Sequence, residues 1–115
     1  MPRTVPIAAS TLGAGNTIVA GVTGQIVRVL GFHLSFSGAV NAKFQSNGTM
    51  DLSGLFYGGT GVQVPGADLP TFEHGKPPAY FETLSGEPLT LNLSAGVAVG
   101  GFVHYELLLA SLAQQ

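Results

Sequence analysis

The segment AVNAKFQSNGTM, residues 39–50, restricts the fold more than any other part of the chain. Val40, Ala42 and Phe44 alternate with polar residues, which is the period of a β-strand that buries one face. The Asn47–Gly48 pair comes next, and both residue types readily adopt the positive φ angles of a tight hairpin turn. The pattern therefore predicts a strand over 39–46, a turn at 47–48 and a returning strand after it.

The same period of two recurs in QIVRVLGFHLSFS, residues 25–37. Its even positions are expected to face the core, and its odd positions, Val27 and Val29 among them, to face outward. Arg28 falls on the even face, and we expect it to reach solvent from the start of the strand. PLTLNLS alternates leucines with polar residues in the same way. The predicted core residues are Phe32, Leu34, Phe36, Phe44, Leu91 and Leu93.

Further strands at NTIVAGV, GVQV, AYFETL and VAVGGFVHYELLLASL bring the total to about eight. Short strands at this spacing are typical of a β-sandwich or barrel. We expect an all-β, antiparallel, jelly-roll-like sandwich, because strands of this number and size need two sheets to close one core. Residues 65–78, rich in proline and glycine, predict a long ordered loop, and such a loop usually carries a function or a contact.

Residues 1–16 are small or polar and contain two prolines. They predict an extended N-terminal arm outside a single packed domain of residues 17–115. Such a segment buries too little apolar surface to fold alone, but it can lie along a partner by strand addition. We expect Val5 and Ile7 to be apolar anchors on a neighbouring subunit or a capsid, and Arg3 to meet an acidic group there. A frayed terminus is the alternative.

Charge is scarce in this chain. Charged residues make up 9% of it, against about 25% in ordinary soluble domains. The run LTLNLSAGVAVGG is small and uncharged, which favours a surface covered by other copies.

The net charge is −2 and the four cations are scattered, which excludes a phosphate-binding cluster and hence nucleic acid as a partner. No cysteine is present, so disulfides and thiolate metal sites are excluded. We expect no signal peptide and no membrane span.

Few residues suggest chemistry. His33 and His104 are expected at a subunit interface. A threefold axis could gather copies of either one into a metal site, but a hydrogen-bonded interface histidine is the commoner outcome, so we predict no metal and no cofactor. Glu73 and His74 put an acid beside a base, yet adjacent loop residues usually point apart, and we predict no catalytic residue.

The proline-rich region carries aromatic residues that suit a surface contact. A sugar-binding platform and a protein contact are both compatible with them, and the sparse charge nearby favours the protein contact. The candidate interface loop consists of Phe56, Tyr57, Phe72 and His74.

Two stretches, AVNAKFQSNGTMDLSG and YFETLSGEPLTLNLSAGVAVGGFVHYEL, together resemble small proteins encoded near tailed-phage head genes. These are capsid decoration (cement) proteins or related virion components. The resemblance runs from about residue 18 to residue 106 and depends on the KFQS strand, the DLSG after the hairpin and the LNLSA and VGG strands. The HGKPP and FYGGTG segments depart from the pattern. The resemblance implies a β-sandwich, often trimeric, bound outside a virion.

We therefore expect a non-enzymatic virion protein that decorates a phage head as a homotrimer. Its partners would be further copies of itself and the major capsid protein. It would be made in the host cytoplasm and end on the capsid surface. The alternative is a receptor- or carbohydrate-binding module of a phage fibre or spike that uses residues 56–78.

Overall fold

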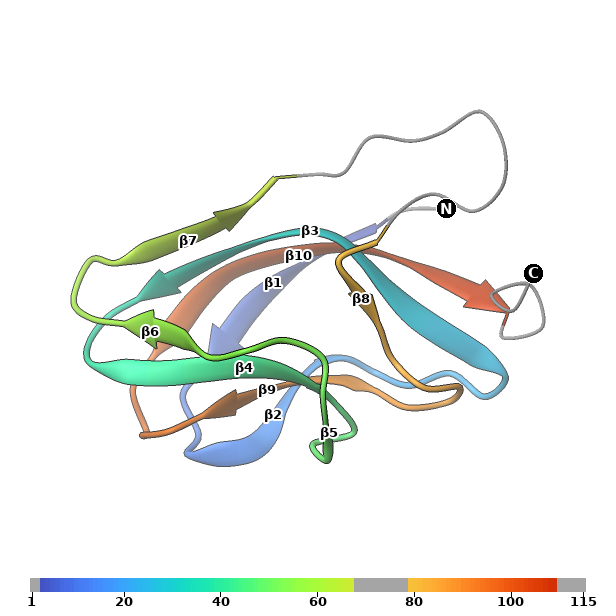
Figure 1. Cartoon of the computed structure of the whole chain (residues 1–115), viewed down its shortest axis with the longest axis horizontal. Helices are drawn as coiled ribbons and strands as arrows, with labels where there is room; N and C mark the ends of the chain where they lie inside the picture. The colour runs from blue at the N-terminus through green and yellow to red at the C-terminus, as the bar shows by residue number, and fades with distance from the viewer. Residues whose placement is uncertain (1–2, 68–78, 110–115) are drawn as a thin grey trace.

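The computed structural model describes residues 3–67 and 79–109 of the chain (Figure 1). Within these two ranges the chain forms ten strands and no helix, which confirms the all-β expectation. The strands are β1 (Arg3–Ala9), β2 (Gly13–Val19), β3 (Gln25–Phe36), β4 (Val40–Ser46), β5 (Met50–Asp51), β6 (Phe56–Gly58), β7 (Gln63–Gly66), β8 (Phe81–Glu82), β9 (Leu89–Leu93) and β10 (Val99–Leu109).

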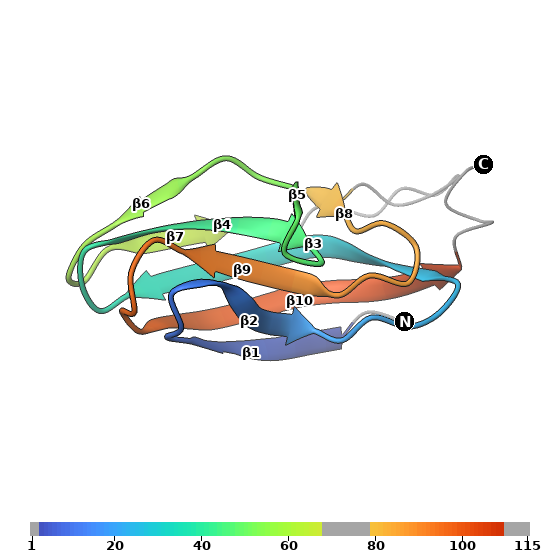
Figure 2. The ribbon, with the colours of Figure 1, turned by 90° about the horizontal axis from the view of Figure 1, so that it is seen from below.

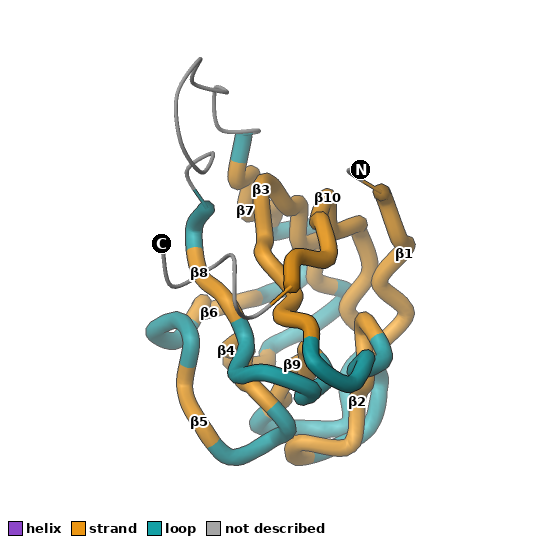
Figure 3. The backbone as a smooth tube through the Cα atoms, turned by 90° about the vertical axis from the view of Figure 1, so that its right-hand side faces the viewer, coloured by secondary structure: helices purple, strands orange, loops and turns teal. Residues whose placement is uncertain are grey.

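The strands form two five-stranded antiparallel sheets that pack face to face (Figures 2 and 3). Sheet A has the order β1-β10-β3-β7, and β8 also pairs with β3. Sheet B has the order β2-β9-β4-β5, and β6 also pairs with β4. The architecture is therefore a β-sandwich, as the sequence predicted.

The pairings are nested along the chain. β1 pairs with β10, β2 with β9, β3 with β7 and β8, and β4 with β5 and β6. Consecutive strands from β1 to β4 alternate between the two sheets, so the chain crosses from one sheet to the other at each end of the sandwich. The chain also crosses between the sheets from β6 to β7 and from β9 to β10. These two connections meet those between β1 and β2 and between β3 and β4 at one end of the sandwich.

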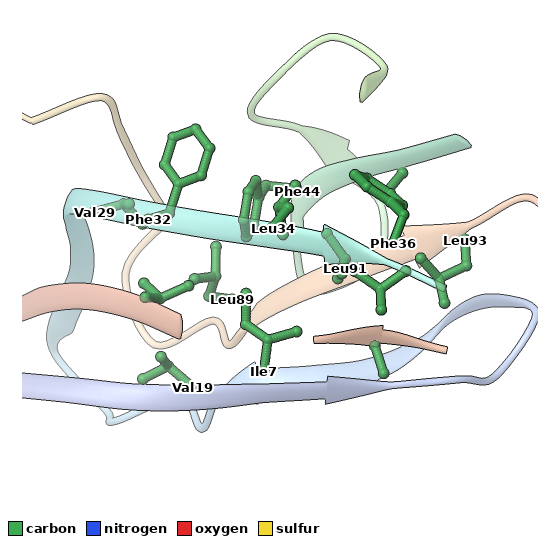
Figure 4. Close-up of a cluster of buried hydrophobic side chains, with 14 of the residues drawn as sticks. Ile7, Val19, Val29, Phe32, Leu34, Phe36, Phe44, Leu89, Leu91 and Leu93 are labelled. Carbon is green, nitrogen blue, oxygen red and sulfur yellow. The ribbon is translucent and has the colours of Figure 1, made fainter. Parts of the chain in front are cut away.

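The hydrophobic core lies between the sheets (Figure 4). All six predicted core residues are buried there, which confirms the period-two reading of β4 and β9 and of the second half of β3. Phe44 lies in the aromatic part of the core, where its ring contacts those of Phe32, Phe56 and Phe81 at centroid distances of 5.1 to 6.1 Å. The hairpin turn is confirmed as well, with φ angles of 55° at Asn47 and 70° at Gly48.

The first half of β3 corrects one prediction. In this half of the strand the odd-numbered residues Val27 and Val29 belong to the core, whereas the even-numbered residues were expected there. The cause is a β-bulge: Gly31 pairs with His104 and Val29 with Tyr105, so Leu30 has no partner in β10 and the alternation changes face there. Arg28 therefore lies on the outer side of sheet A, yet it is only 2% exposed and does not reach solvent.

The expected N-terminal arm is the second correction. Residues 3–9 form β1 and pair along their whole length with β10 of the same chain. Val5, Ile7 and Ala9 alternate with Thr4, Pro6 and Ala8, and Ile7 is 4% exposed within the core. The arm was predicted from the small and polar residues and the two prolines of 1–16, and this composition does not exclude a strand at the edge of a sheet. β1 is an edge strand of its sheet, and an edge tolerates a residue without an N–H group.

Other differences concern element lengths. The strand after the hairpin is reduced to β5, and the strand expected over AYFETL is reduced to β8. The loop expected over 65–78 begins only after β7, and residues 68–78 lie outside the described ranges. Among the residues that the structure does describe, no helix has the length and hydropathy needed to cross a membrane.

Candidate functional site

At one end of the sandwich, the connections that the structure describes contain no charged residue. Four connections meet there: residues 10–12 between β1 and β2, 37–39 between β3 and β4, 59–62 between β6 and β7, and 94–98 between β9 and β10 (left in Figure 1). Ser37 N donates to Ala98 O and so joins two of these connections, and Phe36 N at the end of β3 donates to Val62 O of a third. These connections contain only glycine, alanine, serine, threonine, valine and leucine. We call this surface the uncharged end.

The charged residues of the described ranges gather toward the opposite end. Arg28 of β3 lies between Glu82 of β8 and Glu106 of β10, with Nε–Oε2 and Nη1–Oε1 distances of 3.3 and 2.6 Å. Glu87 follows in the connection between β8 and β9 and accepts a hydrogen bond from Ser46 Oγ. Arg3 begins β1, opposite Tyr105 in the register.

A hollow of about 440 Å³ opens at the edge of the uncharged end. It is lined by residues 7–10, 35–37 and 98–100, which belong to β1, β3, β10 and the connections beside them. Its floor is small: Ala8, Gly100 and Ser35 lie side by side across three strands in register. Leu12 stands on the neighbouring connection with 64% of its surface exposed, and it does not line the hollow.

The outer face of sheet A carries an aromatic pair two positions away from Gly100 and Ser35, in the direction away from the uncharged end. Phe102 of β10 lies opposite His33 of β3, and their rings are nearly parallel, at 11°, with centroids 5.9 Å apart. The Nε2–H of His33 donates to Oε1 of Gln63 on β7 at 3.0 Å. Phe102 is 43% exposed. We call Phe102, His33 and Gln63 the platform.

The outer face of sheet B is different, because its side chains hydrogen-bond to one another. Gln45 donates to Asp51 at 2.7 Å and accepts from Asn92 at 3.1 Å, and Lys43 reaches Asp51 at 3.1 Å. The hydrogen bond from Gln45, then that from Lys43, and the charge of Lys43 lower the pKa of Asp51 from its ordinary value of 3.8. This network satisfies its own polar groups and offers no apolar surface.

The three predicted arm residues differ in burial. Ile7 is buried in the core and Val5 packs against it, so neither is available as an anchor on a partner. Both were misassigned because their alternation with Thr4 and Pro6 was not taken as a strand. Arg3 is exposed at the start of β1, and its contact with an acidic partner group stays a prediction.

The predicted interface loop is also divided. Phe56 points inward and contacts the rings of Phe32 and Phe44, which rules it out as a surface anchor. Tyr57, the next residue on β6, points the other way and is 72% exposed. Phe72 and His74 lie outside the described residues.

The structure brings His33 and His104 onto the same outer face of sheet A. His104 lies opposite Gly31, two residues from the pair that His33 makes with Phe102. Their role in a subunit contact stays a prediction.

Sequence reasoning missed Leu12, Gln63 and Phe102. Phe102 could have been found: Val99 and Val103 mark the buried face of β10, so a large aromatic residue at an intervening even position must point outward. Gln63 had no comparable signal, because its position beside His33 depends on the pairing of β7 with β3.

No cofactor or metal site can be assigned in residues 3–67 and 79–109. That part of the chain contains no group of three or more histidine, aspartate or glutamate side chains close enough to share a metal ion. No family model matches the chain, and neither a curated protein nor a solved structure matches it.

Proposed function

We propose that this chain is a structural, non-enzymatic protein of a phage virion: a capsid decoration protein that assembles as a homotrimer on the head surface and stabilises it. Its partners are further copies of itself and the major capsid protein, and it reaches the virion from the host cytoplasm. The observation that carries the proposal is the uncharged end. An end of four connections without one charge is unusual for a surface that stays in water, and it suits a contact that removes water.

The shape of this end supports a ring of copies. Leu12 protrudes from one connection, and the hollow of about 440 Å³ opens beside it with a floor of small residues. A protrusion and a hollow at different places on one surface suit a heterologous contact, in which each copy inserts its protrusion into the next. Such contacts close into a ring when the rotation between copies allows it, and three copies is the smallest ring of this kind.

The nested strand order supports a jelly-roll fold. A jelly roll has eight strands in two sheets, and it is formed by rolling up a long antiparallel hairpin. The pairing of β1 with β10, β2 with β9, β3 with β7 and β4 with β6 follows that plan. Domains of this type recur in viral capsids and lectins, so the fold alone favours neither a capsid role nor a sugar-binding role.

A pair of exposed leucines tests the assembly. Leu12→Asp places a charge at the uncharged end, and Leu84→Asp places the same charge at the opposite end, where Leu84 is 51% exposed. Burying an unpaired carboxylate is costly, so Leu12→Asp should weaken trimer formation at least about tenfold, which corresponds to ~1.4 kcal/mol. Leu84→Asp should leave it unchanged. Light scattering over a concentration series measures both, and thermal melts check that both variants fold.

The capsid contact needs its own measurement. Co-sedimentation with heads of the phage that encodes the chain should retain the parent protein and Leu84→Asp. A monomeric parent at micromolar concentration would refute the trimer. A protein that trimerises but never co-sediments with heads would refute the decoration role.

A further inference from the structure

We propose that the outer face of sheet A carries a binding site for a neutral sugar ring, built by the platform of Phe102, His33 and Gln63. The site goes beyond the role in the capsid. It lies on the face of the sheet, whereas the proposed assembly surface is the end of the sandwich.

The platform offers a flat apolar surface with hydrogen-bonding groups beside it. The exposed ring of Phe102 continues into the parallel imidazole of His33. Pyranose rings have one face of C–H groups, which packs on an aromatic ring, and a rim of hydroxyls, which needs hydrogen-bonding partners. Gln63 supplies them: its Oε1 accepts from His33, and its side chain is exposed, so its amide nitrogen can donate to a sugar hydroxyl.

The backbone holds the platform in place. Gly101, between Gly100 and Phe102, has a φ of 124°, and a Cβ there would collide with the carbonyl oxygen of His33. Glycine at this position lets β10 approach β3 closely at the point where the two rings become parallel. The hydrogen bond to Gln63 fixes the orientation of the imidazole. A preformed platform binds a ligand without first having to order its side chains.

A hollow beside the platform fits one ring. It measures about 260 Å³ and is lined by Phe32, His33, residues 65–67 and Phe102. This is below the ~300–1,000 Å³ of sites for drug-sized ligands, so it suits a single sugar unit with its neighbours lying along the face. Its lining contains no aspartate, glutamate, lysine or arginine. The site therefore favours a neutral ligand over an anionic one.

Other occupants fit less well. A peptide that adds a strand needs a free sheet edge, but both edges of sheet A are interrupted by proline: Pro6 in β1 and Pro65 in β7. A nucleic acid needs cations near the aromatic rings, and the nearest described cation on this face, Arg28, is held between two carboxylates.

Titration with defined oligosaccharides tests the site. The probes are cellotetraose, maltotetraose, chitotetraose and galactotetraose, with tetragalacturonate as the anionic counterpart, each added to isotopically labelled protein and followed by NMR. At about 10 mM, a Kd of ~1 mM still occupies most sites. We expect at least one neutral probe to shift the resonances of Phe102, His33 and Gln63, and the anionic probe to bind at least about tenfold more weakly.

Variants separate this site from the assembly surface. Phe102→Ala and Gln63→Ala should each weaken binding at least about tenfold, since the first removes the flat surface and the second a hydrogen-bond partner. Tyr57→Ala, which removes an exposed aromatic ring from sheet B, is the matched control and should bind as the parent does. Leu12→Asp should also bind normally, even where it no longer trimerises.

Three results would overturn the proposal. One is that none of the four neutral probes binds at the highest concentration. Another is that binding survives Phe102→Ala unchanged. The third is that Phe102→Ala abolishes trimerisation while no sugar binds, which would make the platform a contact between copies.

Discussion

The two ends of the sandwich are built from the same kind of short connection but from different residues. At the uncharged end, 10–12, 37–39, 59–62 and 94–98 carry no charge, and a hollow opens between them. Toward the other end, Arg28 is enclosed by two carboxylates and Glu87 is bound by Ser46. Among the described residues, Arg28, Glu82 and Glu106 form an ion-paired cluster toward this end, and none of the charged residues lies in the four connections of the uncharged end.

This difference shows how a chain with 9% charged residues can divide its surface. Charges that are paired within one copy need no partner residue on another copy. An end without charged residues has only a small free-energy cost of desolvation when a contact removes its water. Low overall charge is therefore no sign of a poorly folded chain here. It reflects one surface suited to contact and another suited to water.

The largest effect is expected at the buried charge. Arg28→Ala removes the buried cation that Glu82 and Glu106 share, so it should destabilise the fold by about 3–5 kcal/mol. Lys43→Ala removes the cation of the exposed pair with Asp51 and should cost no more than about 1 kcal/mol. Urea unfolding measures both. Equal costs would mean that the charged end is no more than a solvated surface.

Arg28→Met separates charge from packing. It keeps most of the side-chain volume but still removes the cation that bridges the two carboxylates, so it should remain clearly less stable than the parent. A methionine variant as stable as the parent would assign the cost of Arg28→Ala to lost packing alone.

A smaller effect is expected from the turns. Gly48 has a φ of 70°, and Gly48→Val forces a β-branched residue into that conformation, at a cost of about 1–3 kcal/mol. Gly96, at the uncharged end, has an ordinary φ, and an added Cβ would lie 3.5 Å from Ser10 O. Gly96→Ala should therefore stay within about 0.5 kcal/mol. Thermal melts compare them, and a Gly48→Val midpoint equal to that of the parent would contradict the turn assignment.

The smallest effect is pH dependence on the outer face of sheet B. The pKa of Asp51 is lowered in the folded state, first by Gln45 and then by Lys43. Its stabilising contribution is therefore complete above the unfolded value of 3.8 and is lost as the pH falls through the lower folded value. Between about pH 5 and pH 2, the parent should lose slightly more stability than Asp51→Asn. Urea midpoints at both pH values test this, and identical losses would count against it.

Much of the fold could be predicted from alternation alone. Where one face is buried and the other is not, a period of two fixes which side chains enter the core, and Phe44, Leu91 and Leu93 were assigned correctly for this reason. The Asn47–Gly48 turn could also be predicted, because few residue types other than asparagine and glycine readily adopt a positive φ angle.

The errors arose where pairing overrides the local pattern. The bulge at Leu30 reverses the faces of β3, and it exists only because β10 has one residue fewer there. Residues 1–16, with their two prolines, were predicted to form an arm, and Pro6 is acceptable in β1 because that strand lies at a sheet edge. The platform could not be predicted as a unit, because Phe102, His33 and Gln63 come from three strands that are distant in sequence.

The pairing of β1 with β10 has a consequence for the route by which the chain folds. Almost the whole sequence separates the two partners, so the loop between them must close before the pair forms. Proteins dominated by such distant contacts fold in milliseconds to seconds, orders of magnitude more slowly than helical bundles. During synthesis, β1 emerges before β10, so it has to wait for its partner until β10 has left the ribosome. A proline in the middle of that waiting strand hinders pairing with the wrong neighbour throughout this interval.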